Sequence, residues 1–221
     1  MKINKKKEIE FFFDCSSPWT YLAFKEIVPL CSRNSCSLIW KPILVGGIFN
    51  STNPSVYETR KNPVKEKFVY SQKDLQDWAN IRNVTINWPD IFPVNSVKAM
   101  RGVFYALTLE DRFGKEFSEN LNYSGELYRY VEAVFHAYWE DNLDISSEKV
   151  LGNIVDSLGW KKEKFLFFIQ EPSTKDRLRL NTQELINRGG FGSPTIFLDK
   201  TNMFFGNDRL DLIDKLLKLN C

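Results

Sequence analysis

Residues 17–20, Ser-Pro-Trp-Thr, follow an apolar run that ends at Asp14, and they open a segment with helical periodicity. Thiol oxidoreductases carry Cys-Pro-x-Cys at such a junction, whereas Ser17 and Thr20 place hydroxyls at both sulfur positions here. The first turn of a helix presents unpaired N–H groups and a partial positive charge, which lower the pKa of a cysteine at that position. With Ser17 there, the field remains without its anion, and the hydroxyl is suited to donate to an external thiolate. Simple capping of the helix by Ser17 is the alternative.

A second motif, Gly192-Ser193-Pro194-Thr195, stands at the start of a predicted strand. A cis bond before Pro194 is typical of a conserved tight turn, and it would direct the Ser193 backbone toward the Ser17 end of the helix. An extended peptide would pair with that backbone as an added strand. An ordinary trans proline that opens an edge strand is the alternative.

A third motif, Gly206-Asn207-Asp208-Arg209, precedes the last predicted helix. The N–H groups at such a helix start bind a carboxylate, and Asp208 is placed to pair with an ammonium group. Together these groups suit the head group of an α-amino acid. Simple capping by Asn207 or Asp208 is the alternative.

The composition narrows the class of protein. The 221 residues are 43% hydrophobic and 26% charged, which predicts one large domain or one domain with a sizeable insertion. A net charge of +2 does not indicate a basic surface for binding nucleic acid. No window approaches the roughly 18 apolar residues that a membrane helix needs, and the start of the chain lacks a secretory signal. Neither nucleic acid nor a membrane is expected as a partner.

Cysteine and histidine usage restricts the chemistry further. The four cysteines, at 15, 31, 36 and 221, form no Cys-x-x-Cys pair, and without an export signal they indicate reduced thiols and a cytoplasmic location. Cys15 is expected to be a small buried hydrophobe. Because His136 is the single histidine, no metal site is predicted, and a Ser-His-Asp triad would depend on that residue alone. Ser17 and Thr20 cannot form a disulfide, which argues against a dithiol oxidoreductase.

Apolar periodicity places the first motif on a β-α-β unit. Residues 9–13 predict a buried strand, a helix follows from Pro18, and residues 37–45 predict a second strand parallel to the first. The glycine pair at 46–47 ends this unit. Residues 48–68 are predicted to form an extended loop, because they lack clean periodicity and contain several Asn and Pro residues.

The middle of the chain is predicted to be helical, and the end returns to strands. Helices are expected at 74–81, from Asn95 or Ser96 to Gly114, at 120–140, from Ser146 or Ser147 to Gly159, at 161–170 and at 173–188. A strand at 195–198, a turn at Asn202, a strand at 203–205 and a helix after Gly206 complete the chain.

The two ends of the chain must meet, because neither buries its sheet faces alone. The sequence therefore predicts an α/β fold: a discontinuous thioredoxin-like domain of residues 1–45 and 190–221, with a large all-helical insertion of residues 46–189.

The order of these motifs resembles the kappa-class glutathione transferase and 2-hydroxychromene-2-carboxylate isomerase family, in the DsbA-like branch of the thioredoxin fold. The resemblance covers nearly the whole chain. Each segment is weak alone, and their order and spacing carry the likeness. The segments are FFFDCSSPWTYLA at 11–23, KPILVGGIFNSTNP at 41–54, KFVYSQKDL at 67–75, FPVNSVKAMR at 92–101, FGSPT at 191–195 and FFGNDRLD at 204–211.

The resemblance implies glutathione as the cofactor and assigns residues to its site. Ser17 matches the serine that hydrogen-bonds the glutathione sulfur. Ser193 matches the residue before the cis proline, Pro194, whose backbone pairs with the cysteinyl part. Asn207 and Asp208 match the pair that holds the γ-glutamyl group.

Two further matches lie in the middle of the chain. Asn53 matches an asparagine of the glutathione site, and Lys67 matches a lysine near the glycine carboxylate, with Lys65 as its rival. Trp19 departs from the family pattern by replacing a tyrosine. We therefore expect the pocket for the second substrate to differ more than the glutathione site.

The function implied by the resemblance is a glutathione-dependent cis–trans isomerisation of an aromatic α-keto acid. Reversible addition of the thiolate to an activated double bond allows rotation before elimination. Candidates for contacting this substrate are Trp19, Lys41 and Arg101, and a homodimer is implied. The alternatives are a kappa-type glutathione transferase or peroxidase and a non-catalytic glutathione-binding or interaction module.

Overall fold

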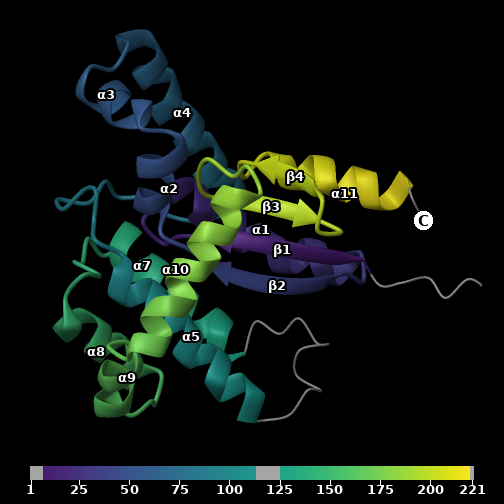
Figure 1. Cartoon of the computed structure of the whole chain (residues 1–221). Coiled ribbons are helices and arrows are strands. Elements are labelled where there is room, and N and C mark those ends of the chain that lie inside the picture. The colour runs from purple at the N-terminus through teal and green to yellow at the C-terminus, as the bar shows by residue number, and fades with distance from the viewer. Residues whose placement is uncertain (1–6, 113–124, 220–221) are drawn as a thin grey trace, which may run out of the picture.

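The computed structural model of the protein describes residues 7–112 and 125–219, and its centre is a four-stranded sheet (Figure 1). The strands are β1 (Glu8–Phe13), β2 (Ser37–Pro42), β3 (Thr195–Leu198) and β4 (Asn202–Phe205), in the order β2-β1-β3-β4. β1 is parallel to β2 and antiparallel to β3, and β3 is antiparallel to β4. Strands from the two ends of the chain thus share one sheet, as predicted.

The alternation of side chains along β1 assigns its two faces to different helices. On one face, Phe12 and Phe197 pack with Leu185 of α10 (Pro172–Asn187), the helix that crosses the front of the sheet in Figure 1. On the other face, Phe11 and Phe13 belong to the main core, together with residues of α1 (Pro18–Arg33) and α11 (Arg209–Leu219). Both faces of β1 are therefore buried away from water, which explains why its sequence is a continuous apolar run.

The remaining helices of the main core are α5 (Val97–Arg112), α7 (Glu126–Trp139), α8 (Glu148–Ser157) and α9 (Lys162–Phe168). They confirm the predicted helices in this part of the chain, and Gly159 follows α8 with a positive φ of 80°, as expected at a helix end. Gly114 and the start of the helix predicted at 120–140 lie outside the described residues. The division into residues 1–45 plus 190–221 and an insertion of 46–189 stays a prediction.

The loop predicted at 48–68 is wrong, because this stretch is helical. It forms α2 (Val45–Thr52), α3 (Ser55–Lys61) and the start of α4 (Lys65–Arg82), and α3 and α4 project beyond the sheet in Figure 1. The glycines at 46–47 lie inside α2 rather than ending the preceding unit. A Cβ on Gly47 would lie 3.2 Å from the Thr182 side chain, so glycine allows α2 to approach α10 closely.

The first turns of α4 were not predicted, and their exposure explains why. Leu75 and Ala79 in the second half are buried, whereas residues 65–70 are all exposed, including Phe68 at 50%. A helix with no buried face in its first half shows no amphipathic period. Asn202 was also misplaced, since it begins β4, while the tight turn is made by Asp199 and Lys200 with φ of 51° and 69°.

A nearly buried ion pair fastens α10 to the sheet. The Arg188 guanidinium donates to both carboxylate oxygens of Glu10 in β1, at 3.2 and 2.6 Å, and lies 3.7 Å from the centre of the Phe197 ring. The Glu10 side chain is only 7% exposed. Arg188 also pairs with Glu184 at 2.8 Å, so loss of the Arg188 charge would leave the buried Glu10 carboxylate without its ion-pair partner, whereas loss of the Glu10 charge would leave Arg188 with Glu184.

We expect Glu10→Gln to lower the free energy of unfolding by about 1–3 kcal/mol, because the charge-assisted hydrogen bonds between Glu10 and Arg188 are weakened while Glu184 still pairs with Arg188. Urea denaturation measures the effect. Asp176→Asn is the matched control, since Asp176 pairs with Arg179 on the open surface of α10, and it should leave the midpoint almost unchanged. Equal effects of the two substitutions would show that the Glu10–Arg188 pair stabilises the fold no more than an exposed ion pair does.

Candidate functional site

Ser17 occupies the N-cap of α1, as the sequence predicted. Its Oγ accepts a hydrogen bond from the Thr20 N–H at 3.3 Å, and Pro18 begins the helix. The same hydroxyl donates to the carbonyl oxygen of Ser193 at 3.2 Å. Ser17 is half-buried, so its hydroxyl stands at the boundary between the helix start and solvent.

The Ser193–Pro194 bond is cis, as predicted, and Ser193 is fixed from two sides. Its hydroxyl lies 2.8 Å from Thr20 Oγ1 and accepts from the Asp14 N–H at 3.0 Å. Both contacts are buried, which favours a fixed geometry. The segment before β3 is thereby held against the N-terminus of α1, so the first two predicted motifs form one site.

Asp14 holds this junction through hydrogen bonds, and it was not among the site residues predicted from the sequence. Its carboxylate accepts from the N–H groups of Ser16 at 2.9 Å and Val45 at 2.8 Å, and the Ser96 side chain also hydrogen-bonds it. Burial raises the pKa of Asp14, and these hydrogen bonds oppose the rise. The only signal in the sequence is an acid at the end of an apolar strand.

Asn207 brings the third motif to the same place. The N–H of Gly206 donates to the Pro194 carbonyl at 3.1 Å, which joins the start of α11 to the segment of Ser193. The Asn207 side chain is buried, yet its Oδ1 has no hydrogen-bond partner among the described residues. A buried acceptor without a donor is costly, and it marks a place for a ligand N–H. Asp208 beside it is exposed and pairs with Arg209 at 3.4 Å.

The two mid-chain candidates are positioned differently. Asn53 ends α2 and accepts from the Ser55 hydroxyl at 2.9 Å, while its neighbour Thr52 donates to the Gly190 carbonyl at 3.4 Å. The end of α2 therefore lies beside the segment that leads to Ser193. Lys67 is exposed in the first turn of α4, as is its rival Lys65, and no contact joins Lys67 to the residues above within the described ranges.

Each candidate for the second substrate is held by its own neighbours. Lys41 pairs with Glu184 at 2.9 Å. Arg101 donates weakly to the carbonyl at the end of α9, at 3.5 Å, and burial lowers its pKa. Trp19 packs against a small cluster that contains Leu75 and Ala79 of α4.

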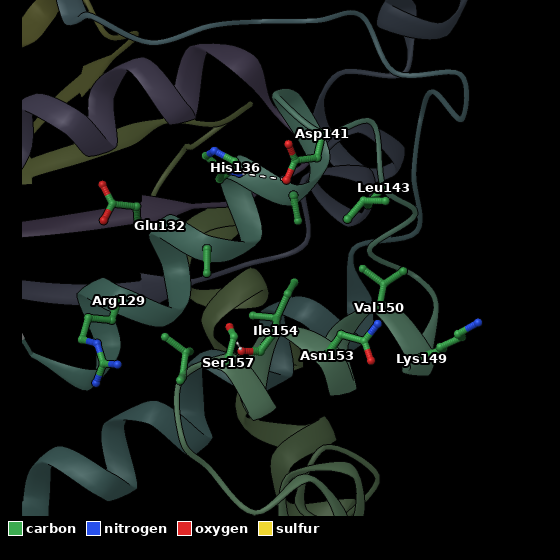
Figure 2. Close-up of a pocket in the computed structure, with 13 residues that line it drawn as sticks. Arg129, Glu132, His136, Asp141, Leu143, Lys149, Val150, Asn153, Ile154 and Ser157 are labelled. Atoms are coloured by element: carbon green, nitrogen blue, oxygen red, sulfur yellow. Dashed lines mark hydrogen bonds and ion pairs between the residues drawn. The ribbon is translucent and has the colours of Figure 1, made fainter.

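A cavity of about 800 Å³ lies between α7 and α8, and it contains none of the predicted site residues (Figure 2). Its floor is apolar, and His136 lies on its rim with Nδ1 3.0 Å from the Asp141 carboxylate. Across residues 7–112 and 125–219, no serine is hydrogen-bonded to His136, so this pair does not form a triad.

Comparisons with known proteins show the family and the fold of this chain. Residues 8–218 match the family model described as a DSBA-like thioredoxin domain. The 2-hydroxychromene-2-carboxylate isomerase of Pseudomonas putida is 27% identical over 220 residues, which cover 96% of this chain and 95% of the relative. The human glutathione S-transferase kappa 1 is 26% identical over 220 residues, with 96% and 91% covered.

A solved structure of 2-hydroxychromene-2-carboxylate isomerase superimposes with a TM-score of 0.74 at 25% identity, covering 97% of this chain and 96% of that one. The predicted resemblance is therefore confirmed. The same findings confirm the predicted α/β class, a thioredoxin-like fold of the DsbA type that carries many additional helices.

The buried hydroxyl pair generates a test of the junction. Thr20→Val keeps the shape of the side chain but removes the partner of Ser193 Oγ, so we expect a loss of about 1–3 kcal/mol in unfolding free energy. Urea denaturation measures this loss. Thr59→Val is the control, because the Thr59 hydroxyl bonds a carbonyl on the exposed helix α3. A Thr20→Val protein as stable as the wild type would contradict a fixed junction.

Proposed function

The chain belongs to the DSBA-like thioredoxin domain family, and on that basis we propose that it is a glutathione-dependent cis–trans isomerase of the 2-hydroxychromene-2-carboxylate isomerase type. The observation that carries the proposal is the Ser17 hydroxyl at the first turn of α1, held 3.2 Å from the Ser193 carbonyl. A hydroxyl in the field of a helix N-terminus is suited to stabilise a sulfur anion supplied from outside.

The residues present fit a glutathione-like peptide. Asn207 Oδ1 is a buried acceptor without a donor, and it would take an N–H of the γ-glutamyl group, with Asp208 close by for the ammonium. The backbone of Ser193 would pair with the cysteinyl part. Asn53 and Lys67 complete the proposed site, with Lys67 directed to the glycine carboxylate.

The chain's own groups set the charge at this site. Ser17 would donate its proton in a hydrogen bond to the sulfur instead of to the Ser193 carbonyl, and the N-terminus of α1 would stabilise negative charge there. Glutathione, when bound, would supply a nucleophilic sulfur for reversible addition to an activated double bond.

A kappa-type glutathione transferase or peroxidase is the second candidate. The support is the human kappa 1 relative, which is 26% identical, against 27% for the Pseudomonas putida isomerase. The same anion site would serve both reactions. The two differ in whether glutathione is regenerated or stays attached to the product. A non-catalytic glutathione-binding module is the remaining alternative.

The partner and the location remain proposals. An aromatic or electrophilic small molecule is the expected substrate, and a homodimer in the cytoplasm stays a prediction. Val64 and the first turns of α4 expose four large apolar side chains, Val64, Phe68, Val69 and Tyr70, and a second chain would cover part of them in such a dimer. Among the described residues, no helix combines the length and the apolar character needed to cross a bilayer.

Ser17→Ala tests the anion site. We expect glutathione to bind the wild type as a thiolate and the variant as a thiol, with the pKa of the bound thiol higher by about 1–2 units in the variant, since a charge-assisted hydrogen bond is lost. Calorimetry and ultraviolet absorbance of the thiolate, followed against pH, measure binding and ionisation together.

Ser147→Ala is the matched control, because Ser147 is the N-cap residue of α8, outside the proposed site, and its side chain makes no capping hydrogen bond. This control should ionise bound glutathione as the wild type does. Wild-type protein that fails to bind millimolar glutathione would overturn the proposed function, and Ser17 would then be only a helix cap.

Lys67→Gln and Lys65→Gln distinguish the two lysines. If Lys67 contacts the glycine carboxylate, its loss should weaken glutathione binding by roughly threefold to tenfold, and the difference should shrink as salt is raised. Lys65→Gln should leave the dissociation constant unchanged. The reverse pattern would assign this contact to Lys65.

A further inference from the structure

The carboxylate of an aromatic keto acid requires a cation near the site, and Arg60 of α3 is available for this role. Its guanidinium lies 5.3 Å from the ring centre of Phe49 and 5.4 Å from that of Phe92, so the two rings contact the same cation. Within residues 7–112 and 125–219, no carboxylate comes within ion-pair distance of Arg60. The residue is exposed despite these contacts.

The rings beside Arg60 lead directly to the loop of Ser17. Phe92 lies 5.1 Å from Trp88, and Trp88 lies 5.9 Å from Trp139. The indole N–H of Trp139 donates to the carbonyl oxygen of Cys15 at 2.9 Å. Trp88 is 49% exposed, so a flat aromatic face is open to solvent next to this loop.

Tyr138 contacts the same aromatic segment. The Tyr138 hydroxyl donates to the carbonyl of Ile91, in the segment that carries Trp88 and Phe92. Burial raises the pKa of Tyr138, the charge of Asp14 raises it further, and the charge of Arg60 lowers it. Arg60 and Asp14 therefore both act on one hydroxyl beside the site.

We propose that Arg60, whose guanidinium lies over the rings of Phe49 and Phe92, binds the carboxylate of a flat aromatic substrate whose ring lies against Trp88. The inference rests on the proposed function, because it names the second substrate of the same site. Lys41 is paired with Glu184, and the Nε of Arg101 is buried without a partner among the described residues, whereas the guanidinium of Arg60 is exposed where a substrate can reach it.

The contacts with the two rings suit Arg60 to binding a carboxylate. Aromatic rings contact the planar guanidinium through cation–π interactions, while its N–H groups point outward in the plane and match a carboxylate in a bidentate pair. The rings also restrict the side chain before the ligand arrives, which reduces the entropy lost on binding. A lysine ammonium at this position would offer charge without the planar fork.

The test uses chromone-2-carboxylate, a stable planar aromatic acid, and its methyl ester, both titrated without glutathione. Tryptophan fluorescence and calorimetry report binding. We expect Arg60→Gln to raise the dissociation constant of the acid by roughly tenfold or more, with the ester changed by less than about twofold. Arg60→Lys should fall between, and Trp88→Leu should weaken acid and ester alike.

Arg177→Gln is the matched control, since Arg177 of α10 also lies over a ring, 4.3 Å from the centre of Phe104, and it should bind both probes as the wild type does. Equal losses for acid and ester in Arg60→Gln would make Arg60 a structural clamp and overturn the proposal. Wild-type protein that does not bind the acid at millimolar concentration would overturn it too. Because glutathione is absent, these results are independent of the thiolate titration.

Discussion

The site depends on the contact between the Ser193 segment and the first turn of α1. The Ser193 hydroxyl is held by Thr20 Oγ1 at 2.8 Å and by the Asp14 N–H at 3.0 Å, and the Ser193 carbonyl accepts from Ser17. These three hydrogen bonds join residues separated by more than 170 positions in the chain. The two ends of the sequence therefore build one site, and the pairing of β1 with β3 aligns them.

The hydroxyl at position 17 changes the chemistry of this junction without changing its shape. A helix N-terminus favours an anion whether or not the chain supplies one. In the proposed function the stabilised sulfur comes from a ligand, because Ser17 stands in place of a thiol. Asn207 Oδ1 has no partner in the described part of the chain, and in the proposal it accepts from an N–H of the same ligand.

Local patterns in the sequence were sufficient for much of the fold. The apolar run before Asp14, the Ser-Pro start of α1 and the glycines after α8 and α10 predicted the strand and helix boundaries correctly. The stretch from Val45 to Lys67 was not predictable in this way. α2 depends on Asp14, which is remote in sequence and accepts from the Val45 N–H, and the first half of α4 has no buried face.

The same distinction applies to the site. Ser17, Ser193 and Asn207 lie in motifs with turn and cap residues, so the sequence indicated them. Arg60 did not stand out, because its significance comes from Phe49 and Phe92, which approach it only after α2, α3 and the following loop have packed. Trp88 did not stand out either, because its segment shows no periodicity that would reveal that this side chain is half exposed.

The most direct measurement follows the interconversion of 2-hydroxychromene-2-carboxylate and its ring-opened trans isomer by absorbance, with free glutathione quantified in the same reaction. For an isomerase, we predict turnover only when glutathione is present, with its concentration unchanged at equilibrium. Turnover without glutathione, or no turnover by a protein that binds it, would contradict the isomerase function. Stoichiometric consumption of glutathione into a conjugate would assign the chain to the transferases instead.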